Sequence, residues 1–245
     1  MERIFIFGAT SAMAHATARF YAAEGATFFL VARQAEKLQT VTNDLLAQGA
    51  TRVETTVMDA LEFQRHQSVV AMAHASMGGI DVALLAHGQA PDQKACEASF
   101  DLTRHEFEVN GLSIISLLTH LANYCENAGH GKIVVISSVA GDRGRSSNYV
   151  YGSAKGALDR FLQGLRNRLH RRGVKVITIK PGFVDTPIAA HYPKNWLWAK
   201  PTTAGRAIHR AIKRGREVAY VPWFWQIIMS VIRALPEFIF KRLSL

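Results

Sequence analysis

Short apolar runs alternate with longer segments of helical spacing along the 245 residues of the chain. Seven runs are rich in β-branched or aromatic residues and are bounded by Gly, Pro, Asp or Ser, which is typical of buried strands in a parallel sheet. These runs are Arg3–Phe7, Thr27–Ala32, Arg52–Met58, Val82–Ala86, Lys132–Ser137, Lys175–Lys180 and Val218–Val221. The helical segments are Ala12–Glu24, Gln34–Gln48, Glu62–Met77, Thr103–Asn127, Asn148–Arg172 and Thr202–Arg214.

This alternation predicts an α/β fold, a Rossmann-type, doubly wound parallel β-sheet flanked by helices and built from right-handed crossovers. No repeat or linker rich in Pro or Ser divides the chain, so we expect residues 1–222 to form a single domain. Residues 223–245 are expected to form an apolar and basic C-terminal tail, which is part of the same domain or lies at an interface. In such sheets ligands bind beyond the carboxyl ends of the strands, so we expect the chemistry there.

The charge of the chain is distributed unevenly. Residues 1–130 contain 8 basic and 14 acidic residues, whereas residues 131–245 contain 21 basic and 5 acidic residues. A basic half can attract nucleic acid, an anionic bilayer or a phosphorylated small molecule. No recognition helix or RNA-binding strand signature is visible, so nucleic acid is not an expected partner. The apolar content of 49% excludes an intrinsically disordered chain.

The two cysteines, Cys96 and Cys125, are too few for a disulfide framework and lack partners at metal-ligand spacing. We therefore expect free thiols, a reducing compartment and no metal site. No signal peptide is visible, and no apolar stretch reaches the roughly 20 residues that a membrane-spanning helix needs. The expected location is the cytoplasm, and the alternative is a peripheral position at the inner face of the membrane.

The first predicted strand leads straight into a turn of small residues, Gly8-Ala9-Thr10-Ser11-Ala12-Met13. Such a turn lets backbone N–H groups and the helix N-terminus face a pyrophosphate, the alternative being a plain strand–helix connection. Arg33 follows the second predicted strand and can pair with the 2′-phosphate of NADP(H), where NAD(H) would favour a carboxylate. Asp59 follows the third and can bind the adenine amino group or cap a helix. NADP(H) is the favoured cofactor and NAD(H) the alternative.

Ser138, Tyr151 and Lys155 are the candidate catalytic residues. Ser138 ends the fifth predicted strand, and the tyrosine and lysine lie four residues apart on one helix face. An ammonium group beside a phenol is expected to lower the phenol's pKa, so that Tyr151 can exchange a proton with a carbonyl or alcohol oxygen. Ser138 can bind the same oxygen. Asn110 is expected to interrupt the preceding long helix and to hold a water molecule that links Lys155 to solvent.

Together these motifs resemble the short-chain dehydrogenase/reductase family over residues 3–221. The resemblance implies Asn110, Ser138, Tyr151 and Lys155 as a catalytic tetrad, and it implies a homodimer or homotetramer formed through the helices that flank the active site. Val184 and Thr186, in the Pro181-Gly182-Phe183-Val184-Asp185-Thr186 match, would bind the nicotinamide carboxamide. The cofactor site implied by the turn and the resemblance comprises Gly8, Thr10, Ser11, Ala12, Met13, Arg33, Asp59, Ala86, Gly88, Tyr151, Lys155, Pro181, Gly182, Val184 and Thr186.

The chain departs from the family pattern at two places. Ala12 and Ala14 stand where glycine is usual, and Ala86-His87-Gly88 replaces the usual Asn-Ala-Gly after the fourth strand. His87 can face the cofactor or substrate, or it can simply pack in the loop. The departures concern the fit of the dinucleotide, not the chemistry.

Two regions bear on the substrate. Arg143 and Arg145 follow the candidate serine and, together with Ser138 and Tyr151, are predicted to contact substrate, by binding a phosphate or sugar; the alternative is a solvated or subunit-contact loop. The tail begins Pro222-Trp223-Phe224-Trp225 and ends with Lys241 and Arg242, which suits an interfacial helix on an anionic membrane or a helix docked on a neighbouring subunit. These regions resemble the decaprenylphosphoryl-2-keto-erythro-pentofuranose 2-reductases, which implies a ketone on a lipid-linked sugar.

The sequence thus predicts an NAD(P)-dependent oxidoreductase that passes hydride between nicotinamide and a carbonyl or secondary alcohol, acting as a keto-sugar reductase. A reductase of an unrelated lipid or small ketone is one alternative. A non-enzymatic dinucleotide sensor or scaffold on the same fold is another, although the presence of both Tyr151 and Lys155 disfavours it.

Overall fold

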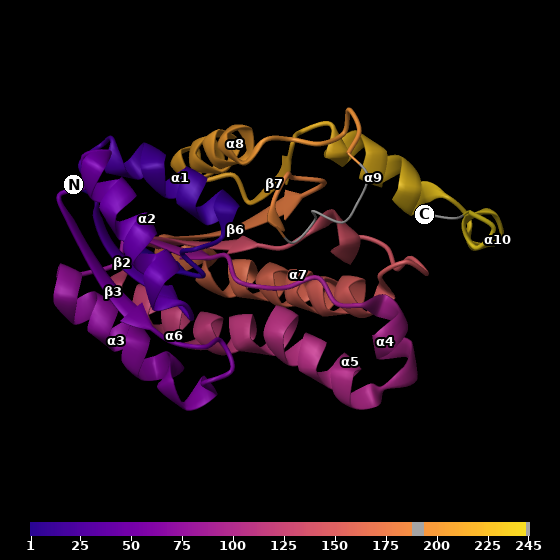
Figure 1. The fold of residues 1–245 in the computed structure, drawn as a ribbon, viewed down its shortest axis with the longest axis horizontal. Coiled ribbons are helices and arrows are strands. Elements are labelled where there is room, and N and C mark those ends of the chain that lie inside the picture. Colours follow the sequence, from indigo (N-terminus) through magenta and orange to yellow (C-terminus); the bar gives the residue numbers. More distant parts are fainter. Residues whose placement is uncertain (188–193, 244–245) are drawn as a thin grey trace.

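The computed structural model describes residues 1–187 and 194–243, which contain a seven-stranded sheet (Figure 1). All neighbouring strands are parallel, in the order β3-β2-β1-β4-β5-β6-β7. The strands are β1 (Arg3–Phe7), β2 (Thr27–Ala32), β3 (Arg52–Val57), β4 (Val82–Leu85), β5 (Gly131–Ile136), β6 (Val174–Pro181) and β7 (Val218–Val221). The predicted doubly wound α/β fold is confirmed.

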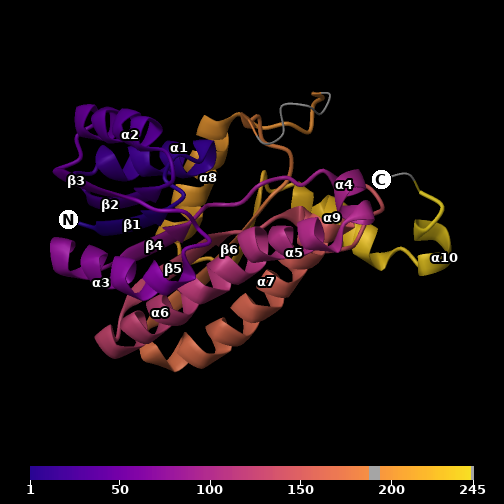
Figure 2. The same ribbon diagram turned by 60° about the horizontal axis from the view of Figure 1, so that its bottom comes forward.

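Helices cover both faces of the sheet (Figure 2). One face carries α1 (Ala12–Ala22), α2 (Ala35–Ala47) and α8 (Pro201–Lys213), and the other carries α3 (His66–Met77), α6 (Ser113–Ala128) and α7 (Tyr149–Leu169). Short helical turns η1 (Phe63–Arg65), η3 (Val139–Gly141) and η4 (His170–Arg172) join these elements.

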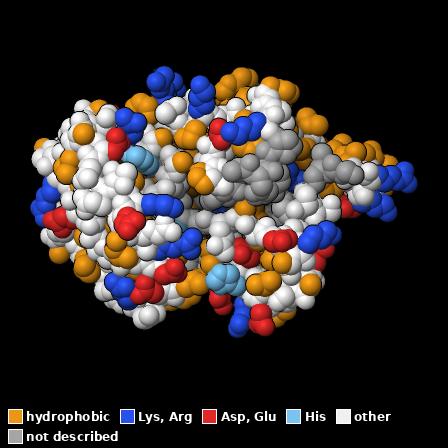
Figure 3. Space-filling view, in the orientation of Figure 1, with side chains coloured by type: hydrophobic (Ala, Val, Ile, Leu, Met, Phe, Trp, Pro, Cys, Tyr) orange, Lys and Arg blue, Asp and Glu red, His pale blue; other side chains and the backbone are white. Residues whose placement is uncertain are grey.

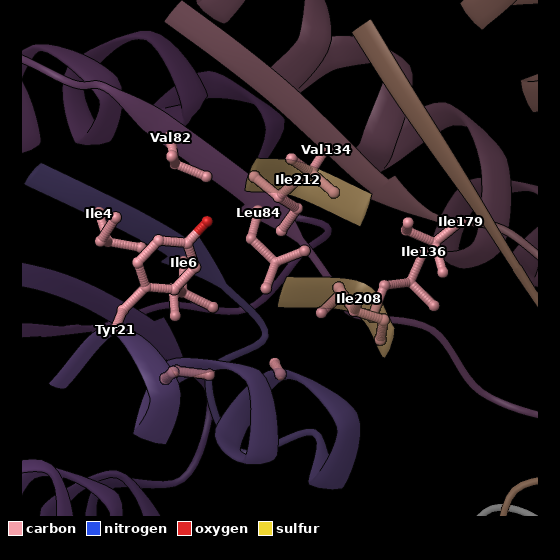
Figure 4. Packing of buried hydrophobic residues seen from close by; sticks show 14 of the residues in the cluster. Ile4, Ile6, Tyr21, Val82, Leu84, Val134, Ile136, Ile179, Ile208 and Ile212 are labelled. Carbon is pink, nitrogen blue, oxygen red and sulfur yellow. The ribbon is translucent and has the colours of Figure 1, made fainter. Parts of the chain in front are cut away.

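Strand β1 shows why both faces are covered. Successive side chains of a strand point to opposite faces, so Ile4 and Ile6 pack on the side of α1 and α8, whereas Phe5 and Phe7 pack on the side of α3, α6 and α7. All four are buried, as a parallel sheet with helices on both faces requires. Figure 4 shows the first cluster, where Ile4 and Ile6 lie among Tyr21, Leu84, Ile208 and Ile212.

Strand β3 corrects the prediction that every run is a buried strand. It lies at the edge of the sheet and pairs only with β2 among the described strands. Its residues are half-buried or exposed, and the side chains of Arg52 and Glu54 form an ion pair on it. An edge strand has one free side, and charged side chains keep that side from pairing with another chain.

The predicted helix over Thr103–Asn127 is instead a series of elements. Helix α5 (Phe100–Phe107) passes into a π-helical turn, η2 (Glu108–Leu112), and then into α6. The predicted interruption at Asn110 is therefore present as this wider turn, and such turns are common at functional sites. A further short helix, α4 (Gln93–Ala98), lies in a segment where no helix was predicted.

The tail packs on the rest of the chain through α9 (Trp225–Ala234), followed by α10 (Glu237–Phe240). Trp225 and Met229 are buried in a small cluster with Val139, which follows the candidate serine. Residues 244 and 245 of the predicted tail lie outside the described residues. Within the described ranges, no helix is long and apolar enough to cross a bilayer.

Candidate active site

Two adjoining cavities lie at the carboxyl ends of the strands, where β1 neighbours β4. Their volumes are about 330 Å³ and 120 Å³, and both are lined by Ser11, Met13 and His87. The structure brings every residue of the predicted cofactor site to these cavities. The larger is lined by Gly8, Thr10, Ser11, Ala12, Met13, Arg33, Asp59, Ala86, Gly88 and Thr186; the smaller adds Tyr151, Lys155, Pro181, Gly182 and Val184.

The turn after β1 forms one wall of the larger cavity. Gly8 has a positive φ of 84°, and a Cβ atom there would lie 2.6 Å from the backbone nitrogen of His87. Only glycine suits both this conformation and this close approach. Helix α1 begins after Ser11, and none of the described side chains accepts a hydrogen bond from its first N–H groups. The N–H groups of Gly8, Ala9 and Ser11 already donate to backbone oxygens, so the donors left for a phosphate are those at the start of α1.

The outer end of the larger cavity is basic. Arg33 and Lys37 both line it, the lysine coming from the first turn of α2. Sequence reasoning missed Lys37, although its place one helical turn beyond Arg33 was the signal that could have found it. Asp59 lines the same cavity, and one of its carboxylate oxygens accepts the N–H of Leu61 at 2.9 Å. The alternative prediction of a helix cap at Asp59 is wrong, because the next helical turn begins only at Phe63, with Glu62 at its N-cap.

Ser138, Tyr151 and Lys155 meet in the smaller cavity. Tyr151 and Lys155 come from the first two turns of α7, and Ser138 follows β5. The Ser138 hydroxyl bonds the Tyr151 side chain and also accepts the N–H of Ala140 at 3.1 Å. These contacts fix the serine between the strand end and the helix, so that a carbonyl oxygen in the cavity can meet both hydroxyl groups.

The pKa of Tyr151 departs from the prediction. Burial raises its pKa to about 12, the Ser138 hydrogen bond lowers it, and the negative charge of Asp159 adds to the increase. The ammonium group of Lys155 lies 5.7 Å from the centre of the phenol ring. Burial also lowers the pKa of Lys155 to about 8, against the opposing effect of Asp159. Desolvation therefore outweighs the predicted effect of the ammonium group on the phenol.

Asn110 lies beside this cavity, fully buried in the π-helical turn. Its side-chain oxygen accepts the N–H of Gln89 at 3.0 Å, and its nitrogen donates to Glu106 at 2.9 Å. Gln89 also donates to Glu106, at 2.7 Å. The asparagine thus ties the segment after β4 to helix α5; the water link to Lys155 stays a prediction.

His87 lies beneath both cavities. Its Nε2 atom is 2.9 Å from the Ser113 hydroxyl, its ring packs 4.8 Å from the ring of Phe7, and its Nδ1 atom is buried with no partner among the described residues. Burial lowers the pKa of His87 to about 3, and the charges of Lys155 and His66 add to this effect. The ring is therefore neutral at neutral pH and acts as packing in the cavity floor.

The prediction for Arg143 is corrected by the structure. Its guanidinium group donates to the backbone oxygens of Ile232 and Leu235, both at 2.6 Å, and lies 3.7 Å from the centre of the Phe240 ring. It therefore holds the tail, and within the described part of the chain neither Arg143 nor Arg145 lines either cavity. The carbonyl of Arg145 accepts the N–H of Asn148 at 3.0 Å, which closes the bend before α7.

One wall of the smaller cavity is aromatic, a feature that the sequence reasoning missed. Phe183 lines the cavity, stacks on Trp198 at 5.3 Å and meets Trp225 edge-on at 5.5 Å. The indole of Trp225 lies directly against Gly182, where a Cβ atom would be 2.0 Å from its ring nitrogen. Helix α9 of the tail therefore supports the wall from behind.

Comparison with known proteins gives consistent results. The family model described as short chain dehydrogenase matches residues 2–196. A Mycobacterium tuberculosis protein named an uncharacterized oxidoreductase is 38% identical over 240 residues, which are 98% of this chain and 96% of that protein. A Streptomyces coelicolor protein, also named an uncharacterized oxidoreductase, is 36% identical over 243 residues, 98% of this chain and 95% of its own.

Among solved structures, an alcohol dehydrogenase from the archaeon Thermococcus sibiricus, complexed with 5-hydroxy-NADP, has the same fold. The TM-score is 0.79 at 21% identity, and the match covers 90% of this chain and 96% of that one.

The burial of His87 predicts a loss of stability in acid. The pKa of His87 is about 3 in the folded chain and near 6.5 when the ring is exposed. Below pH 6.5 the unfolded chain therefore binds a proton that the folded chain does not bind, and the free energy of unfolding decreases as the pH falls. Between pH 6.5 and 5 the free energy of unfolding should drop by about 2 kcal/mol more in the wild type than in His87→Asn. Urea unfolding across this range measures the difference. His170→Asn, at an exposed position, is the control, and parallel curves for wild type and His87→Asn would contradict the prediction.

Proposed function

Because the chain belongs to the short-chain dehydrogenase family, we propose that it is a nicotinamide-dinucleotide-dependent oxidoreductase that interconverts a carbonyl group and a secondary alcohol. One observation carries the proposal: Ser138, Tyr151 and Lys155 share a cavity that adjoins a larger one with a phosphate-binding turn. The residues present fit a dinucleotide, with Gly8 and the start of α1 at the pyrophosphate and Val184 and Thr186 at the nicotinamide. The bound cofactor would supply or accept hydride.

In this proposal Tyr151 donates the proton to the carbonyl oxygen during reduction and takes it back during oxidation. Its raised pKa keeps the phenol protonated at neutral pH, which suits proton donation. Ser138 binds the same oxygen and fixes its direction. Lys155, with a pKa of about 8, is charged at neutral pH and stabilises the phenolate that is left after the proton has moved.

The test removes the phenol hydroxyl. Tyr151→Phe is expected to reduce kcat for carbonyl reduction by at least a hundredfold, the usual contribution of general acid catalysis, while leaving cofactor affinity within a few-fold. Cofactor absorbance with a panel of ketones measures turnover, and cofactor fluorescence measures binding. Tyr149→Phe, at an exposed position on the same helix, is the matched control. Equal turnover by Tyr151→Phe and the wild type would exclude Tyr151 as proton donor.

The favoured cofactor is NADP(H). Arg33 and Lys37 line one end of the larger cavity, and two cations there can share the charge of a 2′-phosphate. The bound 5-hydroxy-NADP in the Thermococcus sibiricus alcohol dehydrogenase gives further support.

Substitution of both cations tests this choice. Arg33→Ala/Lys37→Ala is expected to raise the KM for NADPH by at least tenfold while changing the KM for NADH less than threefold, because only NADPH carries the phosphate. Steady-state kinetics with each cofactor measures the two constants. Lys94→Ala removes a cation that is 87% exposed and lines neither cavity, so it serves as control. A parallel change in both KM values would count against the phosphate site.

The proposed substrate is a keto group on a sugar or lipid-linked sugar, and the proposed partner of the tail is an anionic membrane. Phe183 gives the smaller cavity an apolar wall. On the tail, the apolar residues Trp223, Ile227, Val231 and Phe238 are exposed, and so are the basic residues Arg233, Lys241 and Arg242. Hydrophobic and basic side chains gather at the end of the molecule where α9 and α10 lie (Figure 3). Apolar residues flanked by cations suit the surface of an anionic bilayer.

The membrane contact is tested at two side chains that do not support the fold. Ile227 and Val231 are 60% and 59% exposed, so Ile227→Asp/Val231→Asp should leave stability nearly unchanged. We expect this variant to lose at least tenfold in binding to vesicles of anionic lipid, measured by co-sedimentation. Met72→Asp, at a 49% exposed position on α3, is the matched control. Equal binding by all three proteins would refute the contact.

A homodimer or homotetramer is the proposed assembly. Phe100 and Leu102 on α5 and Leu112 before α6 are exposed apolar residues near the active site, and a partner subunit would bury them. Sedimentation velocity distinguishes this assembly from a monomer.

A further inference from the structure

A group of buried charges lies behind the smaller cavity and has no part in the proposed proton transfer. Lys180, at the end of β6, forms ion pairs with two carboxylates, Asp142 and Asp159, the second at 2.6 Å. Asp142 also accepts the hydroxyl of Tyr220 at 2.8 Å, and its side chain is only 2% exposed. Buried charges are costly unless they are paired, so this group must keep its geometry.

Each member of the group comes from a different part of the active site. Asp159 lies on α7, one helical turn beyond Lys155, and its second oxygen accepts the hydroxyl of Ser137 at 2.6 Å. Ser137 lines the smaller cavity and immediately precedes Ser138. Asp142 follows η3, the short turn that begins directly after Ser138. Lys180 therefore connects the segment that carries the serine to the helix that carries the lysine.

The backbone beside these charges is closely packed. A Cβ atom on Gly141 would lie 2.9 Å from the backbone carbon of Lys155 and 3.1 Å from the Asp159 carboxylate. A Cβ atom on Gly152 would lie 2.8 Å from the carbonyl oxygen of Ala140. The turn after Ser138 thus lies directly on the face of α7 that holds the catalytic lysine.

We propose that Lys180, Asp142 and Asp159 form a buried ionic clamp that positions Ser138 and Lys155 by holding residues 139–142 against helix α7. This inference rests on the proposed function, because it assigns the clamp to that site. Lys180, Asp142 and Asp159 are positioning residues, since none of the three lines either of the two cavities described above.

The clamp also sets the electrostatic environment of the site. Asp159 raises the pKa of both Lys155 and Tyr151, whereas Lys180 and Asp142 together carry no net charge. Removal of Asp159 should therefore lower the pKa of Lys155, and joint removal of Lys180 and Asp142 should leave it nearly unchanged. The other ionisable or charged groups around the site are His87 after β4, Glu106 on α5 and Tyr220 on β7.

Two variants separate charge from position. In Asp159→Asn, which keeps an oxygen for Ser137, we expect the Lys155 titration to move down by on the order of one pH unit. In Lys180→Met/Asp142→Asn we expect that titration to stay within a few tenths of a unit, while amide hydrogen exchange in residues 139–142 becomes at least tenfold faster. The Lys155 titration is followed by NMR of lysine labelled with ¹³C at Cε, and Lys155→Met assigns the signal.

Activity gives the third readout. The double variant should lose at least tenfold in kcat with little change in KM, and Lys180→Arg, which keeps the charge, should retain most of the wild-type kcat. Tyr149→Phe, at an exposed position on α7 outside the clamp, should change none of these quantities. An unshifted Lys155 titration in Asp159→Asn, or exchange in the double variant no faster than in Tyr149→Phe, would overturn the clamp. Titration and exchange need no substrate, so failure of the proposed reaction is distinguished from failure of the clamp.

Discussion

The burial of strand β1 on both faces is the constraint on which the rest of the structure depends. Ile4 and Ile6 contact one helical layer and Phe5 and Phe7 the other, and β1 pairs with β2 along one edge and with β4 along the other. The chain must then leave β1 toward β2 on one side and return to β4 on the other. The divergence of these connections places the turn at Gly8 beside His87 and creates the space for the two cavities.

Features encoded by neighbouring residues could be predicted from the sequence. The alternation of strands and helices, the turn at Gly8 and the four-residue spacing of Tyr151 and Lys155 are of this kind, and the structure brings those two side chains to one cavity. Contacts between distant segments could not be predicted. Arg143 binds carbonyls about 90 residues further along the chain, and Lys180 meets Asp142 and Asp159 only after the sheet has formed. Neither leaves a local pattern.

The chemistry of the site is shaped more by exclusion of water than by pairwise charge. Spacing alone suggested that Lys155 would make Tyr151 more acidic, whereas burial raises the pKa of the phenol and lowers that of the amine. Both shifts favour the uncharged forms, as expected when ions are removed from water. The degree of burial depends on packing from several elements at once. A sequence motif can therefore identify Tyr151 and Lys155 but cannot predict the pKa values of their side chains.

The contact between Trp225 and Gly182 bears on where the catalytic unit ends. The indole of Trp225 fills the space that a side chain at residue 182 would need, and the ring of Phe183 packs against the same indole. A fragment that stops at residue 222 would keep the seven described strands together with Ser138, Tyr151 and Lys155, yet it would lack the ring that fills the space behind Phe183. A domain boundary drawn after the last described strand would therefore give a shorter protein whose smaller cavity is open to water behind Phe183.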